Sequence, residues 1–236
     1  MIKKNRKMKK EKIHAKTVNS ITQKNALKII ENNKNKIFTK EFYNEKLNNW
    51  EKASYMKNYK IQEIILNDLF VGKNKYKADI DFKIRMLDLF YSTNLKEGKG
   101  KMIRNIQKKE IMDRIEKGDK NVIKKISKVK SNKHGKKDCI SFASKYCSRY
   151  NENCFPIYDK YVKQMLCLIN RVTKFTAENI SFSTLHDYNK YCEIVDDFIQ
   201  AFYNNTGIRL NYKKFDRYIW TWAKEILYMI NYRKDN

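Results

Sequence analysis

The residues best suited to chemistry lie in one segment, from Asp138 to Leu166, which contains the only proline of the chain, Pro156. Asp159 follows this proline at the expected start of a helix, where the helix dipole favours an ionised carboxylate. From spacing alone, its simplest role is to stabilise the helix end, by about 0.3–1 kcal/mol. A fixed carboxylate can also stabilise positive charge that develops on a substrate.

Upstream of this acid, Ser141 has a lysine one helical turn before it and another one turn after it. Lys137 and Lys145 stand at i−4 and i+4, so the three side chains share one helix face. Either amine could form a Schiff base with a carbonyl compound. Contact with phosphate or with solvent is the simpler role for both.

The residue pattern assigns these side chains to a helix, a loop and a second helix. The first helix is expected to begin at Asp138 as its N-cap and to end near Tyr150, and the second to begin near Tyr158. A compact basic turn precedes the first helix, a setting suited to a phosphate group. The turn contains Lys133, His134, Gly135, Lys136 and Lys137.

Residues 155–159 read Phe-Pro-Ile-Tyr-Asp, and Val162-Lys163 follow shortly after. This stretch resembles the Gly/Pro–Asp segment of the helix-hairpin-helix DNA glycosylases and is closest to their adenine-specific branch. Ser141 precedes Asp159 by 18 residues, at the family position of a nucleophilic Lys or, in monofunctional members, a Ser. The basic turn 132–137 corresponds to the hairpin, and the resemblance covers about 35 of 236 residues.

The resemblance implies an all-α, two-lobed fold with a cleft, and an enzyme that excises a damaged or modified base from double-stranded DNA. Such a base is flipped out of the duplex, and Asp159 would stabilise the oxocarbenium-like sugar as the N-glycosidic bond breaks. Ser141 at the nucleophile position implies a monofunctional enzyme that uses water, with Lys145 as a less favoured source of an amine. No cofactor or metal is expected.

The sequence departs from the family at two motifs. The usual hairpin sequence Leu-Pro-Gly-Val-Gly is replaced by His-Gly-Lys-Lys-Asp at residues 134–138. The iron–sulfur cysteines of the adenine branch are absent, and the five cysteines present contain no C-x-x-C pair. An odd number of cysteines without such a pair favours reduced thiols in a cytoplasm.

Three aromatic residues are candidates for a base pocket. Trp220 and Trp222 are two apart on an expected helix, so they face different ways. One of the two is expected in the core and the other at a base pocket or an interface. Tyr158, beside Asp159, could stack on a base or pack in the core.

The net charge gives the broadest indication of a partner. The chain has 52 Lys and Arg against 26 Asp and Glu, a formal charge of +26. Such an excess favours nucleic acid over a membrane surface as the partner. Binding to DNA is then expected to weaken as the salt concentration rises. An A+T-rich coding bias is the alternative source of the lysines. Residues 1–16 carry eight Lys and Arg against one acid and are expected to form a flexible basic arm.

The composition predicts an all-α class, because one Pro and six Gly among 236 residues leave few turns. Residues 17–236 are expected to form one domain, with possible lobes at 17–95 plus the C-terminal helices and at 100–180. Helical spacing is found in 79–91, 101–117, 120–129, 185–203 and 212–232, and no strong strand is found.

No run of 18 apolar residues and no secretory signal is present, which favours a cytoplasmic monomer associated with the nucleoid through DNA. Two functions from different classes remain open. The first is a DNA glycosylase for repair or for defence against foreign DNA. The second is a non-enzymatic, basic, helical protein that binds DNA or RNA.

Overall fold

The computed structural model describes residues 23–232 apart from 53–56, 73, 75, 92, 94, 96–97 and 132–134. The expected basic arm 1–16, as well as Lys133 and His134, lies outside the described residues.

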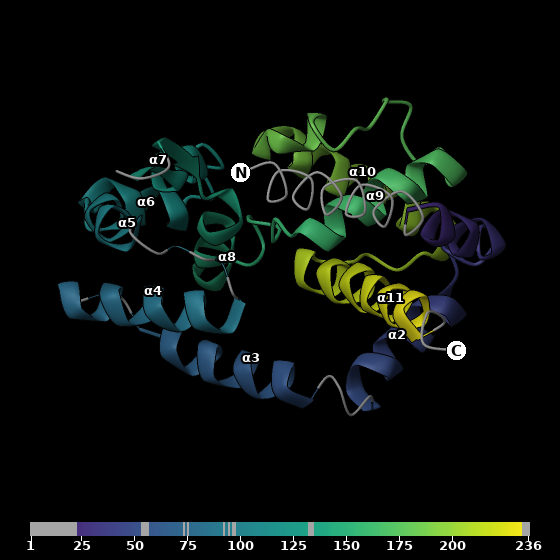
Figure 1. The fold of residues 1–236 in the computed structure, drawn as a ribbon, viewed down its shortest axis with the longest axis horizontal. Helices are drawn as coiled ribbons and strands as arrows, with labels where there is room; N and C mark the ends of the chain where they lie inside the picture. Colours follow the sequence, from purple (N-terminus) through teal and green to yellow (C-terminus); the bar gives the residue numbers. More distant parts are fainter. Residues whose placement is uncertain are drawn as a thin grey trace, which may run out of the picture.

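Helices make up most of the described chain, which confirms the predicted all-α class. Residues 23–32 are helical and precede the labelled elements. The helices are α2 (Lys40–Lys52), α3 (Lys57–Phe70), α4 (Lys77–Tyr91), α5 (Lys99–Ile106), α6 (Lys109–Glu116), α7 (Val122–Ser127), α8 (Ile140–Tyr150), α9 (Lys160–Thr173), the short 3₁₀ helix η3 (Thr184–His186), α10 (Tyr188–Thr206) and α11 (Tyr212–Tyr232). In Figure 1, α5, α6 and α7 gather at one end of the molecule, while α9, α10 and α11 lie at the other.

The sequence predicts no strong strand, and the described residues contain one pair of short strands. The expected helix 120–129 ends as α7 at Ser127, and two short strands follow, β1 (Lys128–Ser131) and β2 (Gly135–Asp138). They pair antiparallel, with Lys128 opposite Asp138. The side-chain amide of Asn105 lies 3.2 Å from Lys125 O and 3.4 Å from Ile126 O, so it satisfies carbonyls at the end of α7.

Two further boundaries differ from the prediction. The expected helix 101–117 is divided into α5 and α6, because Lys108 adopts an extended backbone between them. The break lets each short helix turn its own apolar residues, such as Met102 and Ile111, toward the core. The N-cap of α8 is Cys139, whereas Asp138 is the last residue of β2.

The ends of the later helices follow from their caps. The Asp187 carboxylate accepts a hydrogen bond from the Lys190 N–H at 3.0 Å and begins α10. Gly207 ends the same helix with φ of 70°, a left-handed conformation that favours glycine. None of the described helices is long and apolar enough to cross a membrane.

Candidate functional site

A cavity of about 470 Å³ lies beside Asp159. Its walls come from segments that are far apart in the sequence: α2, α3, α4, α8, the loop before α9, the start of α9, and α11. Aromatic side chains form much of this wall: Trp50, Tyr59, Phe90, Tyr91, Tyr161, Tyr212 and Trp220.

The ammonium group of Lys145 is the centre of the polar part of this wall. Its Nζ lies 3.4 Å from Asp159 Oδ2 and 3.2 Å from Ser141 Oγ. Nζ also lies 4.8 Å from the ring centroid of Tyr91, a favourable arrangement for a cation. Lys145 is buried, with 4% of its surface exposed, so this is an amine held inside the protein beside a carboxylate. Both Lys145 and Asp159 line the cavity.

Asp159 is held by its role as the N-cap of α9. Its Oδ1 accepts a hydrogen bond from the Tyr161 N–H at 2.8 Å, which satisfies one of the free donors at the helix start. Because this bond uses Oδ1, the other oxygen is directed to Lys145. The helix-end role expected from spacing and a place in the cavity wall are therefore compatible.

Hydrogen bonds from neighbouring elements hold the backbone before Asp159 in place. Tyr188 donates its hydroxyl to Pro156 O at 2.8 Å, and Tyr191 donates its hydroxyl to Ile157 O at 2.7 Å. The Tyr158 N–H donates to the Ser144 hydroxyl at 3.0 Å, which joins this segment to α8. The carboxylate and the amine are thus fixed relative to each other by buried hydrogen bonds.

Helix α11 supplies a further part of the wall through residues spaced one helical turn apart. Asp216, Trp220 and Lys224 stand at i, i+4 and i+8 and all line the cavity. The Lys224 ammonium lies 4.9 Å from the Trp220 ring centroid and 4.3 Å from that of Tyr161. Burial lowers the pKa of Lys224, and the negative charge of Asp159 partly restores it.

Asp216 is the most perturbed acid of the cavity. Burial, and next the charge of Asp159, raise the pKa of Asp216 to about 7, although the charge of Lys145 acts in the opposite direction. Its Oδ1 is buried and has no hydrogen-bond partner among the described residues. A carboxyl group of this kind changes its charge near neutral pH and has an unused acceptor beside the cavity.

A charged network closes the side of the cavity next to α3. Arg217 Nη2 lies 2.9 Å from both oxygens of Glu63, and Lys213 Nζ lies 3.2 Å from Glu63 Oε1. Burial by itself would raise the pKa of Glu63, but Arg217 and Lys213 lower it. Glu63 is therefore committed to these two cations, and the other acids that line the cavity are Glu152, Asp159 and Asp216.

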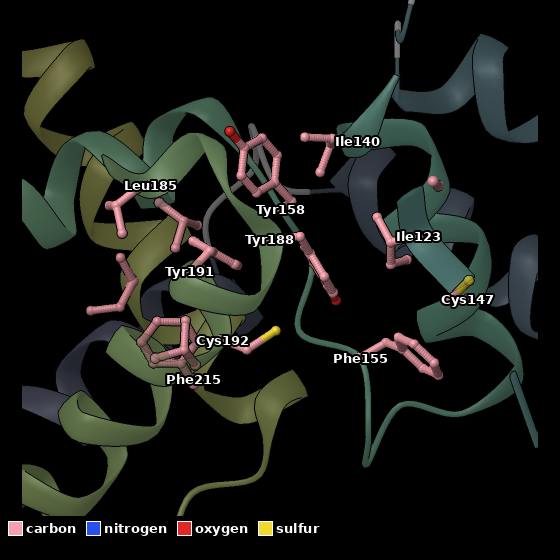
Figure 2. Close-up of a cluster of buried hydrophobic side chains, with 14 of the residues drawn as sticks. Ile123, Ile140, Cys147, Phe155, Tyr158, Leu185, Tyr188, Tyr191, Cys192 and Phe215 are labelled. Carbon is pink, nitrogen blue, oxygen red and sulfur yellow. The ribbon is translucent and has the colours of Figure 1, made fainter. Parts of the chain in front are cut away.

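The structure separates the residues that the sequence suggested for the site. Trp220 lines the cavity, whereas Trp222 is 2% exposed and packs edge-to-face on Phe42 in the core. Tyr158 is also buried, in the cluster with Tyr188 and Tyr191 (Figure 2). These positions place Tyr158 and Trp222 in the core rather than at a base pocket.

The other suggested residues lie elsewhere. Ser141 is not among the residues that line the cavity, and it meets the site through Lys145. Gly135, Lys136 and Lys137 form most of β2, before α8. Sequence reasoning missed Glu63, Asp216 and Lys224 as site residues; the four-residue spacing of Asp216, Trp220 and Lys224 was the available signal.

Comparison with known proteins gives two partial matches. The family model HI_0787_N, described as an N-terminal domain, matches residues 39–154. A protein of Haemophilus influenzae described as uncharacterized is 38% identical over 119 residues, 50% of this chain and 53% of that protein. The chain therefore spans about half the length of this curated relative. No solved structure matches.

The family match covers only part of the cavity wall. It includes Glu63 on α3 and Lys145 on α8, but it ends before Asp159 and before all of α11. Among the described residues, no three His, Cys, Asp or Glu side chains gather closely enough to hold a metal ion.

Proposed function

We propose that the protein is a DNA N-glycosylase that binds double-stranded DNA, flips out a damaged or modified base and releases it. One observation carries this proposal: the buried Lys145 amine and the Asp159 carboxylate, 3.4 Å apart, line a cavity with aromatic walls. An amine beside a carboxylate suits attack on a carbon that gains positive charge, and aromatic walls suit a flat base.

The reacting groups have separate tasks. Asp159 stabilises positive charge on the deoxyribose as the bond from C1′ to the base weakens. Lys145, after loss of a proton, forms a bond to C1′ through Nζ; the bond to the base breaks, its electron pair leaves with the base, and the base takes up a proton. The nitrogen lone pair then forms an imine with C1′ as the C1′–O4′ bond breaks and O4′ takes up a proton. Water hydrolyses the imine to release the amine and an abasic sugar.

The choice of Lys145 as the nucleophile changes the expectation that rested on Ser141. Lys145 faces the cavity, and Ser141 contacts the amine instead through its hydroxyl at 3.2 Å. We therefore assign to Ser141 the task of orienting Nζ. The two groups of helices in Figure 1 would act as the two lobes of a DNA cleft.

The net charge of +26 supports the choice of DNA as the substrate. The experiment is incubation of the full chain with duplexes that carry damaged or modified bases, followed by alkali to cleave abasic sites. We expect base release, and we expect Asp159→Asn to reduce its rate by about 10²–10³ because the stabilising charge is lost. Borohydride added during turnover should trap the protein on DNA, and Lys145→Ala should prevent trapping.

Outcomes that contradict the proposal are specific. Full release by Asp159→Asn would remove Asp159 from the chemistry and return it to its helix-end role. Release without trapping would make water the nucleophile, as the Ser141 position implied. DNA binding without release from any duplex of the panel would favour the non-enzymatic nucleic-acid-binding protein.

A further inference from the structure

The cations that line the cavity differ in how their N–H groups are used. They are Lys145, Arg149, Lys213, Arg217 and Lys224. The first four contact oxygen atoms of neighbouring side chains: a carboxylate 3.4 Å from Lys145, an amide oxygen 2.6 Å from Arg149, and the carboxylate of Glu63 for Lys213 and Arg217. In the part of the chain that the structure describes, Lys224 is the one of the five whose amine has neither a hydrogen bond nor an ion pair. Its N–H groups are therefore available to a molecule in the cavity.

Three aromatic rings hold the amine of Lys224 at the cavity wall. Its Nζ lies 4.3 Å from the ring centroid of Tyr161, 4.9 Å from that of Trp220 and 5.9 Å from that of Tyr59. All three aromatic residues line the cavity, so the charged end of the lysine, and not only its stem, lies at the wall. A base that enters along this wall therefore meets an N–H donor.

The amine also lies at the end of the cavity where the glycosidic bond would break. Tyr161 donates its backbone N–H to Asp159 Oδ1 at 2.8 Å, and the ring of the same tyrosine contacts Lys224. The proposed reaction places C1′ of the sugar beside Asp159. Because the base is bonded to C1′, a donor at this end of the cavity faces the base as it leaves.

We infer that Lys224 is the general acid of the proposed reaction. Its Nζ donates a proton to a ring nitrogen or a carbonyl oxygen of the base as the bond to C1′ breaks. The electron pair of that bond goes to the base, the ammonium becomes a neutral amine, and water returns a proton to the amine after the base has left. The inference rests on the proposed function and adds the source of the proton that the base takes up.

The surroundings of Lys224 suit an acid. Burial lowers its pKa, although the charge of Asp159 acts in the opposite direction. An ammonium group with a lowered pKa transfers its proton more readily near neutral pH. Lys145 cannot supply this proton, because its nitrogen is bonded to C1′ in the same step. The charged groups that neighbouring parts of the chain bring to the cavity include Glu63 on α3, Lys145 and Arg149 on α8, Glu152 and Asp159 before α9, and Asp216 on α11.

Two substitutions separate the proton from the charge. Lys224→Met removes the amine and keeps most of the stem, whereas Lys224→Arg keeps the positive charge on a guanidinium group that does not release its proton. Base release by the full chain is measured in a single turnover at pH 7, on a duplex that the wild type cleaves. We expect both variants to be slower by about 10²–10⁴, the usual contribution of a general acid. Lys214→Met, at an exposed position of α11 outside the cavity wall, is the matched control and should keep the wild-type rate.

Two further measurements respond to a proton donor but not to a structural role. The rate of the wild type should fall on the alkaline side of its pH profile, where Lys224 loses its proton, and Lys224→Met should lack this fall. Added ethylammonium should partly restore release by Lys224→Ala, because a small ammonium ion can supply the missing proton. Duplex affinity of Lys224→Met and Lys224→Arg, measured in parallel by fluorescence anisotropy, should stay near that of the wild type.

Specific results would overturn the inference and leave the glycosylase in place. Release by Lys224→Arg at the wild-type rate would show that only the positive charge matters. Weaker duplex binding by Lys224→Met that Lys224→Arg restores would make the amine a phosphate contact. An alkaline fall that persists in Lys224→Met would assign the proton to another group. If the wild type releases no base from any duplex, the proposed function fails first, and the general acid fails with it.

Discussion

The two oxygens of Asp159 contact different partners. Oδ1 accepts the Tyr161 N–H at 2.8 Å, and Oδ2 lies 3.4 Å from the Lys145 amine. Because the cap fixes one oxygen, the other has little freedom to leave the amine. A residue that looks ordinary as a helix cap is therefore also a rigid support for a buried cation, and an amide in its place would keep the cap while losing the charge.

Asp216 should make stability depend on pH. Its pKa is raised to about 7 by burial and by Asp159, from a usual value of 3.8, so the folded protein keeps a proton that the unfolded chain loses over that window. Stability should therefore fall as pH rises from about 4 to 7. As the pH rises from 5 to 8, the free energy of unfolding of Asp216→Asn should increase by about 1–3 kcal/mol relative to that of the wild type.

Thermal or urea unfolding at the two pH values measures this effect. Asp68→Asn, at an exposed position of α3, is the matched control and should show no such gain. An Asp216→Asn variant whose stability relative to the wild type is the same at pH 5 and pH 8 would mean that the acid is ionised throughout.

The sequence could predict the position of Asp159 at a helix start, but it could not predict the burial of Asp216. Pro156 is followed by Asp159 and then by apolar residues at helical spacing. This local pattern predicts that a helix begins at Asp159. The burial of Asp216 depends on α3, α8 and α11 meeting in space, and no local pattern records this. Ser141 and Lys145 share a helix face, as the spacing predicted, but only the tertiary contacts decide which of them faces the cavity.

Elements with strong caps and broad apolar faces were predicted well. The bounds 212–232 agree with α11, and Gly207 ends α10 as expected. The hairpin of β1 and β2 was missed because its strands have four residues each and are rich in Lys. Val129, 2% exposed, is the apolar anchor of β1, and one such residue gives no detectable alternation.

Gly118, just beyond α6, and Gly207, just beyond α10, provide a matched pair for a stability test. Both have a left-handed backbone, with φ of 71° and 70°, so alanine is strained at either position. At Gly118, an added Cβ would lie 2.6 Å from Cys154 Sγ, whereas at Gly207 no atom of the described part of the chain lies within 4 Å.

We therefore expect Gly207→Ala to lower the free energy of unfolding by about 1 kcal/mol. Gly118→Ala should lower it by about 1–3 kcal/mol more, because overpacking adds to the backbone strain. Chemical denaturation of the two variants measures the difference. Equal losses would show that Cys154 moves aside without cost.

The hairpin provides a second test at the scale of elements. Lys136 and Lys137 lie in β2, directly before the helix that carries Lys145. If this element holds a DNA strand near the site, changing both lysines to Glu should weaken duplex binding more than the same change at Lys108 and Lys109, which are exposed at the start of α6. Binding isotherms at fixed salt compare the two double variants; equal effects would mean that the lysines act only through net charge.

At the scale of the whole molecule, the cavity depends on the closing of the chain on itself. Asn49 on α2 donates to Glu225 on α11 at 2.7 Å, and Lys46 pairs with the same Glu225 at 2.7 Å. These contacts join an early helix to the last helix of the described chain, and Trp50 and Trp220 stand with ring centroids 5.8 Å apart at the cavity. Composition predicts a helical protein, but the joining of these helices follows only from packing.

The net charge of the whole chain predicts that DNA binding depends strongly on salt. With 52 basic and 26 acidic side chains, DNA phosphates should release counterions from the duplex as the protein binds. The logarithm of the affinity should then fall linearly with the logarithm of the salt concentration. For about six to ten phosphate contacts, the affinity should fall by about 10³–10⁵ between 50 and 200 mM salt. Titration of an undamaged duplex by fluorescence anisotropy measures this slope without any need for catalysis, and an affinity independent of salt would exclude the phosphate backbone as the main contact.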